Sequence, residues 1–128
     1  MQEIIKEYEL KRKINNFLYE IKMKTTNVGF CYWLNAMTFY LRQKINNNYD
    51  IASISEVYNY IAEKYSTSVS CIEKAMRYAK ENSKYKEVLK IDSNLKNHAF
   101  LILCTNNLEN CCINNDAKSR QGGYVKKC

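Results

Sequence analysis

The sequence predicts an all-α protein, a compact bundle of about five to six helices that contains a helix-turn-helix. The 128 residues include no proline and only three glycines, so the usual residues of β-turns are almost absent. Apolar residues recur at helical spacing in several segments, and Asn-rich polar stretches separate these segments. With 46% hydrophobic residues, a chain of this length can bury one core without disulfides or metals.

Six segments have the apolar periodicity of amphipathic helices. They cover about 3–21, about 30–45, about ten residues after Ser55, about 69–82, a shorter helix or turn at about 85–91, and 97–108. Ser55 is predicted to cap the third helix and Asn97 the last one. We therefore expect a single helical domain over residues 1–108, followed by a polar, Cys-containing and mobile tail over 109–128.

The third and fourth predicted helices form the most informative stretch, residues 56–79. Ala62 supplies the small residue needed where two helices cross, and Ile72 supplies an apolar contact early in the second helix. Thr67 or Ser68 supplies a capping hydroxyl in the short polar turn. This combination is typical of a helix-turn-helix, whose second helix enters the major groove of DNA.

The fourth helix is predicted to bury one narrow stripe and to expose the rest. The buried stripe is Ile72, Ala75, Met76 and Ala79. The candidate DNA-binding residues of the turn and the outer face are Thr67, Ser68, Ser70, Cys71, Glu73, Lys74, Arg77, Tyr78 and Lys80. A structural interpretation stands beside this one, because Ser70 and Glu73 can form a capping box and Arg77 can pair with Glu73 or Glu81.

The same stretch resembles the C-terminal DNA-binding effector domain of the stage-zero sporulation response regulator family. The resemblance rests on eight residues around the turn: Ile61, Ala62, Thr67, Ser70, Glu73, Ala75, Arg77 and Ala79. Two further blocks agree, LYEI at 18–21 with GFCYWLNAM at 29–37, and NHAFLIL at 97–103. Three blocks in the right order are much more specific than one helix-turn-helix pattern.

The resemblance implies an all-α transcription factor domain that binds double-stranded DNA, often as a homodimer or tandem copies on repeated sites, and that can contact RNA polymerase. It implies base reading by Glu73, Lys74 and Arg77, with Ser68, Ser70 and Tyr78 in support. This chain departs from the family pattern at Cys71, Lys74 and Tyr78, so we expect either a different target sequence or a loss of specificity. Only about 17 residues precede the resemblance, so we expect a stand-alone effector without a receiver domain.

A second hypothesis is a diverged interaction module that no longer binds DNA. It would associate with itself or with a related regulator through an aromatic face formed by Tyr32, Trp33, Phe39 and Tyr40. Exposure of these four side chains distinguishes the two hypotheses, because a docking face must be accessible.

Other classes of function are disfavoured. His98 is the single histidine, no nucleophile has an evident base partner, and no Gly-rich phosphate loop occurs, so we expect no enzyme. Cysteines crowd the C-terminal end without a CxxC pair, so we expect neither a zinc site nor another cofactor. The sequence lacks an apolar run of roughly 18 residues and a signal peptide, so we expect a cytoplasmic protein with reduced thiols and no membrane association.

Overall fold

The computed structural model describes residues 2–46 and 52–118, and the side chains within 7–46 and 52–108. These ranges form six helices and contain no strand, which confirms the predicted all-α fold. The helices are α1 (Gln2–Glu20), α2 (Val28–Asn46), α3 (Ile54–Lys64), α4 (Val69–Glu81), α5 (Tyr85–Leu89) and α6 (Asn97–Lys118).

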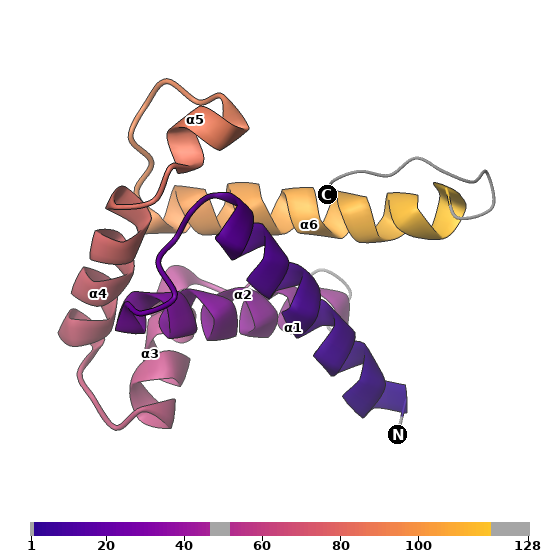
Figure 1. Cartoon of the computed structure of the whole chain (residues 1–128). Helices are drawn as coiled ribbons and strands as arrows, with labels where there is room; N and C mark the ends of the chain where they lie inside the picture. The colour runs from indigo at the N-terminus through magenta and orange to yellow at the C-terminus, as the bar shows by residue number, and fades with distance from the viewer. Residues whose placement is uncertain (1, 47–51, 119–128) are drawn as a thin grey trace.

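Helix α2 is the central element of the bundle. It contacts α1, α3, α4 and α6, and α4 contacts α3 and α6 in addition. Figure 1 shows α4 running across the ends of α2 and α6, with α3 below it and α5 above it. One side of α4 is therefore covered by the bundle, and its opposite side faces away from the other helices.

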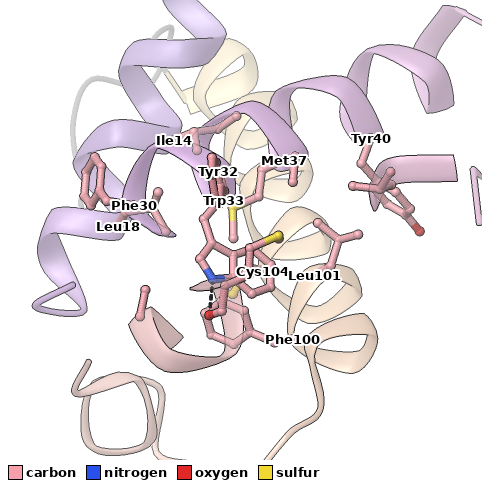
Figure 2. Packing of buried hydrophobic residues seen from close by; sticks show 14 of the residues in the cluster. Ile14, Leu18, Phe30, Tyr32, Trp33, Met37, Tyr40, Phe100, Leu101 and Cys104 are labelled. Atoms are coloured by element: carbon pink, nitrogen blue, oxygen red, sulfur yellow. Dashed lines mark hydrogen bonds between the residues drawn. The ribbon is translucent and has the colours of Figure 1, made fainter. Parts of the chain in front are cut away.

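The core is built around Trp33, which is fully buried in α2. Its ring packs edge-on against Phe100 of α6 with a centroid distance of 4.8 Å, and Phe100 packs edge-on against Tyr85 at 5.0 Å. The indole N–H of Trp33 donates to the carbonyl oxygen of Met76 in α4, at 2.8 Å (Figure 2). A single side chain thus connects α2, α4 and α6.

Hydrogen-bonding side chains fix the start of α3, although not through the residue expected from the sequence. Ser53, not Ser55, is the N-cap: its hydroxyl accepts from the backbone N–H of Glu56, and the Glu56 carboxylate accepts from the N–H of Ser53. This reciprocal pair satisfies two N–H groups that a helix start leaves without partners, whereas a Ser55 cap would satisfy one.

Three of the described helices end in the left-handed conformation without glycine. Lys22 after α1 has a φ of 65°, Ser66 after α3 has a φ of 53° and Lys90 after α5 has a φ of 58°. In each case the next residue donates back to the helix: Met23 to Leu18 at 3.1 Å, Thr67 to Ala62 at 2.9 Å and Ile91 to Lys86 at 2.9 Å. These are Schellman endings, in which glycine is the usual left-handed residue.

Helix α6 differs from the expectation at both ends. Asn97 is its first residue, but the side-chain amide donates to the Tyr58 hydroxyl at 3.1 Å and to the Glu73 carbonyl at 3.3 Å. Because this side chain is buried between α3 and α4, it joins three helices and does not cap α6. The helix continues past Leu108 to Lys118, since neither Gly nor Pro interrupts it there. The domain boundary at 108 stays a prediction, and residues 119–128 of the expected mobile tail lie outside the described residues.

Candidate nucleic-acid interface

The turn between α3 and α4 is short and internally hydrogen-bonded. The N–H of Ser66 donates to Glu63 at 3.3 Å, which together with the Thr67–Ala62 bond closes the end of α3. Ser68 then caps α4, since its hydroxyl accepts from the backbone N–H of Cys71 at 3.1 Å. The local hydrogen bonds thus fix the entry of the chain into α4, in the arrangement of a helix-turn-helix.

The inner face of α4 holds the helix against the bundle. Ile72, Met76 and Ala79 are fully buried, as the periodicity predicts, and Ala75 is half-buried. Gly29 of α2 lies directly against this face: a Cβ atom on Gly29 would be 2.4 Å from the Ala75 carbonyl oxygen. The backbones of α2 and α4 are therefore in contact, so the position of α4 is set by the most central helix.

The outer face presents most of the candidate residues to solvent. Ser68, Ser70, Cys71, Lys74, Arg77 and Tyr78 are exposed, whereas Thr67 and Glu73 are half-buried. Tyr78 is the most exposed of the large hydrophobic side chains on α4, with 61% of its surface exposed. The structure thus brings eight of the nine candidates to one accessible surface formed by the turn and α4.

Lys80 is the exception, and the prediction that it faces solvent is wrong. Only 2% of its surface is exposed, and its ammonium group donates to the backbone carbonyl of Leu95. The segment between α5 and α6 folds over the end of α4 and covers the side chain. Burial lowers the pKa of Lys80, because removing the ammonium from water disfavours its charged form.

Arg77 and Glu73 form an ion pair along the outer face. The Nη1 atom of Arg77 lies 2.9 Å from one carboxylate oxygen of Glu73 and 3.1 Å from the other. The predicted capping box of Ser70 and Glu73 is wrong, because Ser68 caps the helix and the Glu73 carboxylate is turned toward Arg77. Of the structural alternatives that the sequence left open, the Glu73–Arg77 pair is the one that forms.

Cys71 lies in the first turn of α4 with its side chain in solvent. Hydrogen bonds from the hydroxyls of Ser68 and then Thr67 lower the pKa of the Cys71 thiol, and the charge of Lys74 acts in the same direction. A thiol with these neighbours is more reactive than an ordinary one. The candidate surface therefore carries a reactive group beside its hydroxyls and cations.

Val69 is a residue of this surface that sequence reasoning missed. It is the first residue of α4, and 38% of its surface is exposed. Periodicity could not have found it, because Val69 precedes Ile72 by three residues and Met76 by seven and so has the spacing of the buried stripe. An exposed apolar side chain at a helix start can contact a thymine methyl group in the major groove.

The aromatic face required by the interaction-module hypothesis is not available. Tyr32, Trp33 and Tyr40 are 8%, 0% and 1% exposed. Phe39 is half-buried and stacks on Tyr60 with a centroid distance of 4.3 Å. The prediction of an aromatic docking face is wrong, because α2 is central and packs aromatic residues toward several helices at once. Tyr65, just after α3, is 38% exposed and lies edge-on against Tyr32.

Among the described side chains, the cysteine, histidine and acidic residues that could bind a metal ion do not lie together. Within this part of the chain, no three His, Cys, Asp or Glu residues are placed to hold a metal ion. Cys104 is buried, which raises the pKa of its thiol, and His98 is exposed. Cys111, Cys112 and Cys128 lie outside the described side chains. The described helices also include no segment with the length and hydropathy of a membrane span.

A comparison with protein families supplies the classification. The family described as "Sporulation initiation factor Spo0A C terminal" matches residues 14–101. The curated proteins and the solved structures that were compared gave no match. The matched region runs from the buried Ile14 of α1 to Leu101 of α6 and contains the whole α3–turn–α4 unit. The family consists of DNA-binding effector domains of a sporulation regulator, not of enzymes. The match covers well over half of the chain, which therefore belongs to the Spo0A C-terminal domain family.

Proposed function

We propose that this protein is a sequence-specific transcription regulator that binds duplex DNA by placing the outer face of α4 in the major groove. The observation that carries the proposal is the division of α4 into two faces. Ile72, Met76 and Ala79 hold it against the bundle, while polar and cationic side chains on the opposite face are accessible. A helix held in this way can enter a groove without losing any packing.

The outer face of α4 between Val69 and Arg77 is the part that reads bases. Lys74 and Arg77 donate to guanine O6 and N7, and Val69 contacts a thymine methyl group. The hydroxyl of Ser70 donates either to a base edge or to a phosphate. Thr67, Ser68 and Tyr78 flank these residues and form hydrogen bonds with the sugar-phosphate backbone of the DNA. Lys80 is excluded from this set, because its ammonium group is buried under the α5–α6 segment.

Glu73 has two roles in this proposal. In the free protein it holds Arg77 along the exposed surface of α4. An exposed ion pair of this kind is worth about 0–1 kcal/mol, so a guanine can replace the carboxylate at little cost. The released carboxylate then accepts from cytosine N4.

Cys71 and Lys74 indicate that the base preference in DNA differs from that of the family pattern. A thiol at Cys71 provides no cationic contact, and the Lys74 ammonium lacks the planar fork with which arginine grips guanine. One good bidentate contact contributes about 1–3 kcal/mol of discrimination. We therefore propose a reader whose affinity derives largely from charge and whose base preference centres on Arg77.

Fluorescence anisotropy of the purified chain, with reductant and without a phosphoryl donor, tests the proposal. We expect tighter binding, by tenfold or more, to a duplex with a preferred box selected from random DNA than to a scrambled duplex. Arg77→Ala should remove most of this preference. Arg42→Ala is a matched control, because Arg42 also pairs with a glutamate, Glu7, at 3.1 Å and has nearly the same side-chain exposure, 46% against 47%.

Three results bear on the proposal in different ways. Loss of preference in Arg77→Ala alone supports it. Equal losses in both arginine variants would contradict the assigned surface, because Arg42 lies on α2 and not on α4. Absence of binding to any duplex at low salt would contradict DNA binding altogether. The same titration on duplexes with one box and with two boxes tests the proposal that copies bind in tandem.

A further inference from the structure

A hollow of about 390 Å³ lies at the junction of α1 and α2. It is lined by Tyr19, Lys22, Met23, Lys24, Thr25 and Thr26. The two lysines and both threonines are exposed, and none of the six residues is acidic. Glu20, the last residue of α1, is exposed but does not line the hollow.

This junction lies beside the C-terminal end of α4. The backbone N–H of Lys84, just after α4, donates to the carbonyl of Ile21 at 2.7 Å. The contact of Gly29 with Ala75 holds the other end of the junction against the middle of α4. Figure 1 shows the segment between α1 and α2 passing in front of the bundle to reach α4. Lys84 is exposed, so it adds a third cation near the hollow.

Three ammonium groups and two hydroxyls suit the oxygen atoms of a phosphate. Ammonium donors make short, charge-assisted bonds to phosphate, and threonine hydroxyls supply further donors. The backbone of Lys22 is fixed by the Schellman ending of α1, which includes the bond from its N–H to Tyr19 at 3.0 Å. The lysines at 22 and 24 therefore start from a defined backbone and not from a free chain end.

We propose that this hollow, with Lys84 beside it, is a second DNA contact that binds backbone phosphates flanking the major groove occupied by α4. The inference rests on the proposed function and extends it from base reading to the positioning of the protein on the duplex. Phosphate contacts of this type fix register and add affinity without base preference. Their signature is the salt dependence of binding, with a slope of about 0.9 per phosphate contact on B-DNA.

Another cavity in the protein, with a more polar lining, shows what distinguishes this hollow. That cavity, of about 300 Å³, lies between α1, α2 and α3 and contains Lys11, Arg42 and Lys64. Glu7 lies 3.6 Å from Lys11 and 3.1 Å from Arg42, so a carboxylate already occupies the donors there. None of its lining residues comes from α4. Lys11 therefore provides a control, because it carries the same charge as Lys84 but lies at a site without the proposed DNA contact.

The test is a salt series of anisotropy titrations with the preferred and the scrambled duplex. Lys22→Asn combined with Lys24→Gln removes two charges, and Asn tolerates the left-handed backbone at position 22. We expect the slope of log K against log salt to decrease in magnitude by about 1.8 for this double variant and by about 0.9 for Lys84→Gln. Affinity should fall by the same factor on both duplexes, and Lys11→Gln should leave the slope unchanged.

The outcomes separate this inference from the proposed function. If the wild type binds with an Arg77-dependent preference but the double variant keeps the wild-type slope, the second contact is overturned and α4 recognition stands. The inference is also overturned if Lys11→Gln lowers the slope as much as Lys84→Gln does. A further arm is a titration with inorganic phosphate, monitored by the NMR shifts of residues 22–26. If free phosphate binds but the double variant keeps the wild-type slope of log K for DNA against log salt, the DNA contact is overturned. If the wild type binds no duplex, both proposals fail.

Discussion

The indole nitrogen of Trp33 lies 2.8 Å from the carbonyl oxygen of Met76 and donates to it, deep in the core. This bond joins the most buried aromatic residue of α2 to the backbone of the helix proposed to read DNA (Figure 2). One turn earlier in α4, the carbonyl of Glu73 accepts a hydrogen bond from the buried side-chain amide of Asn97 at 3.3 Å. Two side chains from different helices thus bind the backbone of α4, so its outer face is presented in a defined orientation.

Gly29→Ala is predicted to destabilise the protein. The new Cβ would be 2.4 Å from the Ala75 carbonyl oxygen and 2.6 Å from the Ala79 Cβ, and neither atom belongs to a flexible side chain. Forcing extra volume into such a contact costs about 1–3 kcal/mol, which exceeds the gain of up to about 1 kcal/mol in helix propensity. Urea unfolding followed by circular dichroism measures the change. An unfolding free energy equal to or above that of the wild type would refute the close α2–α4 contact.

Ser66→Gly is predicted to stabilise the protein by about 0.5–1 kcal/mol. Ser66 has a φ of 53°, where a Cβ atom is unfavourable and glycine is not. Part of the gain is offset by the greater freedom of glycine in the unfolded chain. The same unfolding assay shows the effect as a higher urea midpoint. A lower midpoint would mean that the Ser66 side chain contributes more than its backbone conformation costs.

Cys71 is predicted to react with iodoacetamide well before Cys104 at neutral pH. Hydrogen bonds from Ser68 and Thr67 lower the pKa of the exposed Cys71 thiol, whereas burial raises the pKa of the Cys104 thiol. Mass spectrometry of digested protein gives the two rates, and denatured protein should abolish the difference. The adduct at Cys71 should weaken DNA binding, and Cys71→Ser should resist this effect. Equal rates in the folded protein would contradict the described surroundings of both thiols.

The burial of Lys80 is predicted to make the free energy of unfolding depend on pH in the alkaline range. Its pKa is lowered below the ordinary 10.5 mainly by burial, so the folded state releases this proton at a lower pH than the unfolded state. Between the two pKa values the unfolded chain binds more protons, and stability therefore rises with pH in this window, just below 10.5. The unfolding free energy of the wild type minus that of Lys80→Met should increase across the window. A difference that is constant or falls with pH would show that Lys80 is not buried.

Periodicity was sufficient to predict the helices and the division of α4 into two faces, because both depend on local spacing. The stripe of Ile72, Met76 and Ala79 repeats at helical intervals, and its burial follows from that spacing. The short turn also has a local cause, since the Ser68 hydroxyl reaches only the first turn of α4. The Ser53 cap was equally readable, because Glu56 follows it at the spacing of a capping box.

Long-range packing was not predictable from the same patterns. Lys80 follows Met76 by four residues and therefore borders the buried stripe, but its charge favours solvent, and it is buried because the segment at Leu95 folds over it. Asn97 has the composition of a cap, but its neighbours across the fold are Tyr58 and Glu73. Whether Trp33 lies in the core or on a surface depends on how many helices surround α2, which no single segment reveals. These are tertiary effects that override local propensity.

The most direct test of the account is an NMR titration of the ¹⁵N-labelled chain with a short duplex. If the outer face of α4 enters the major groove, the largest shifts of backbone amides will fall within residues 67–78, with a second group at 22–26 and Lys84. The amides of α1, and those next to the ion pair between Glu7 and Arg42, should change little, because these residues lie on other elements. Shifts concentrated on α1, with residues 67–78 unperturbed, would contradict the claim that α4 is the DNA-reading helix.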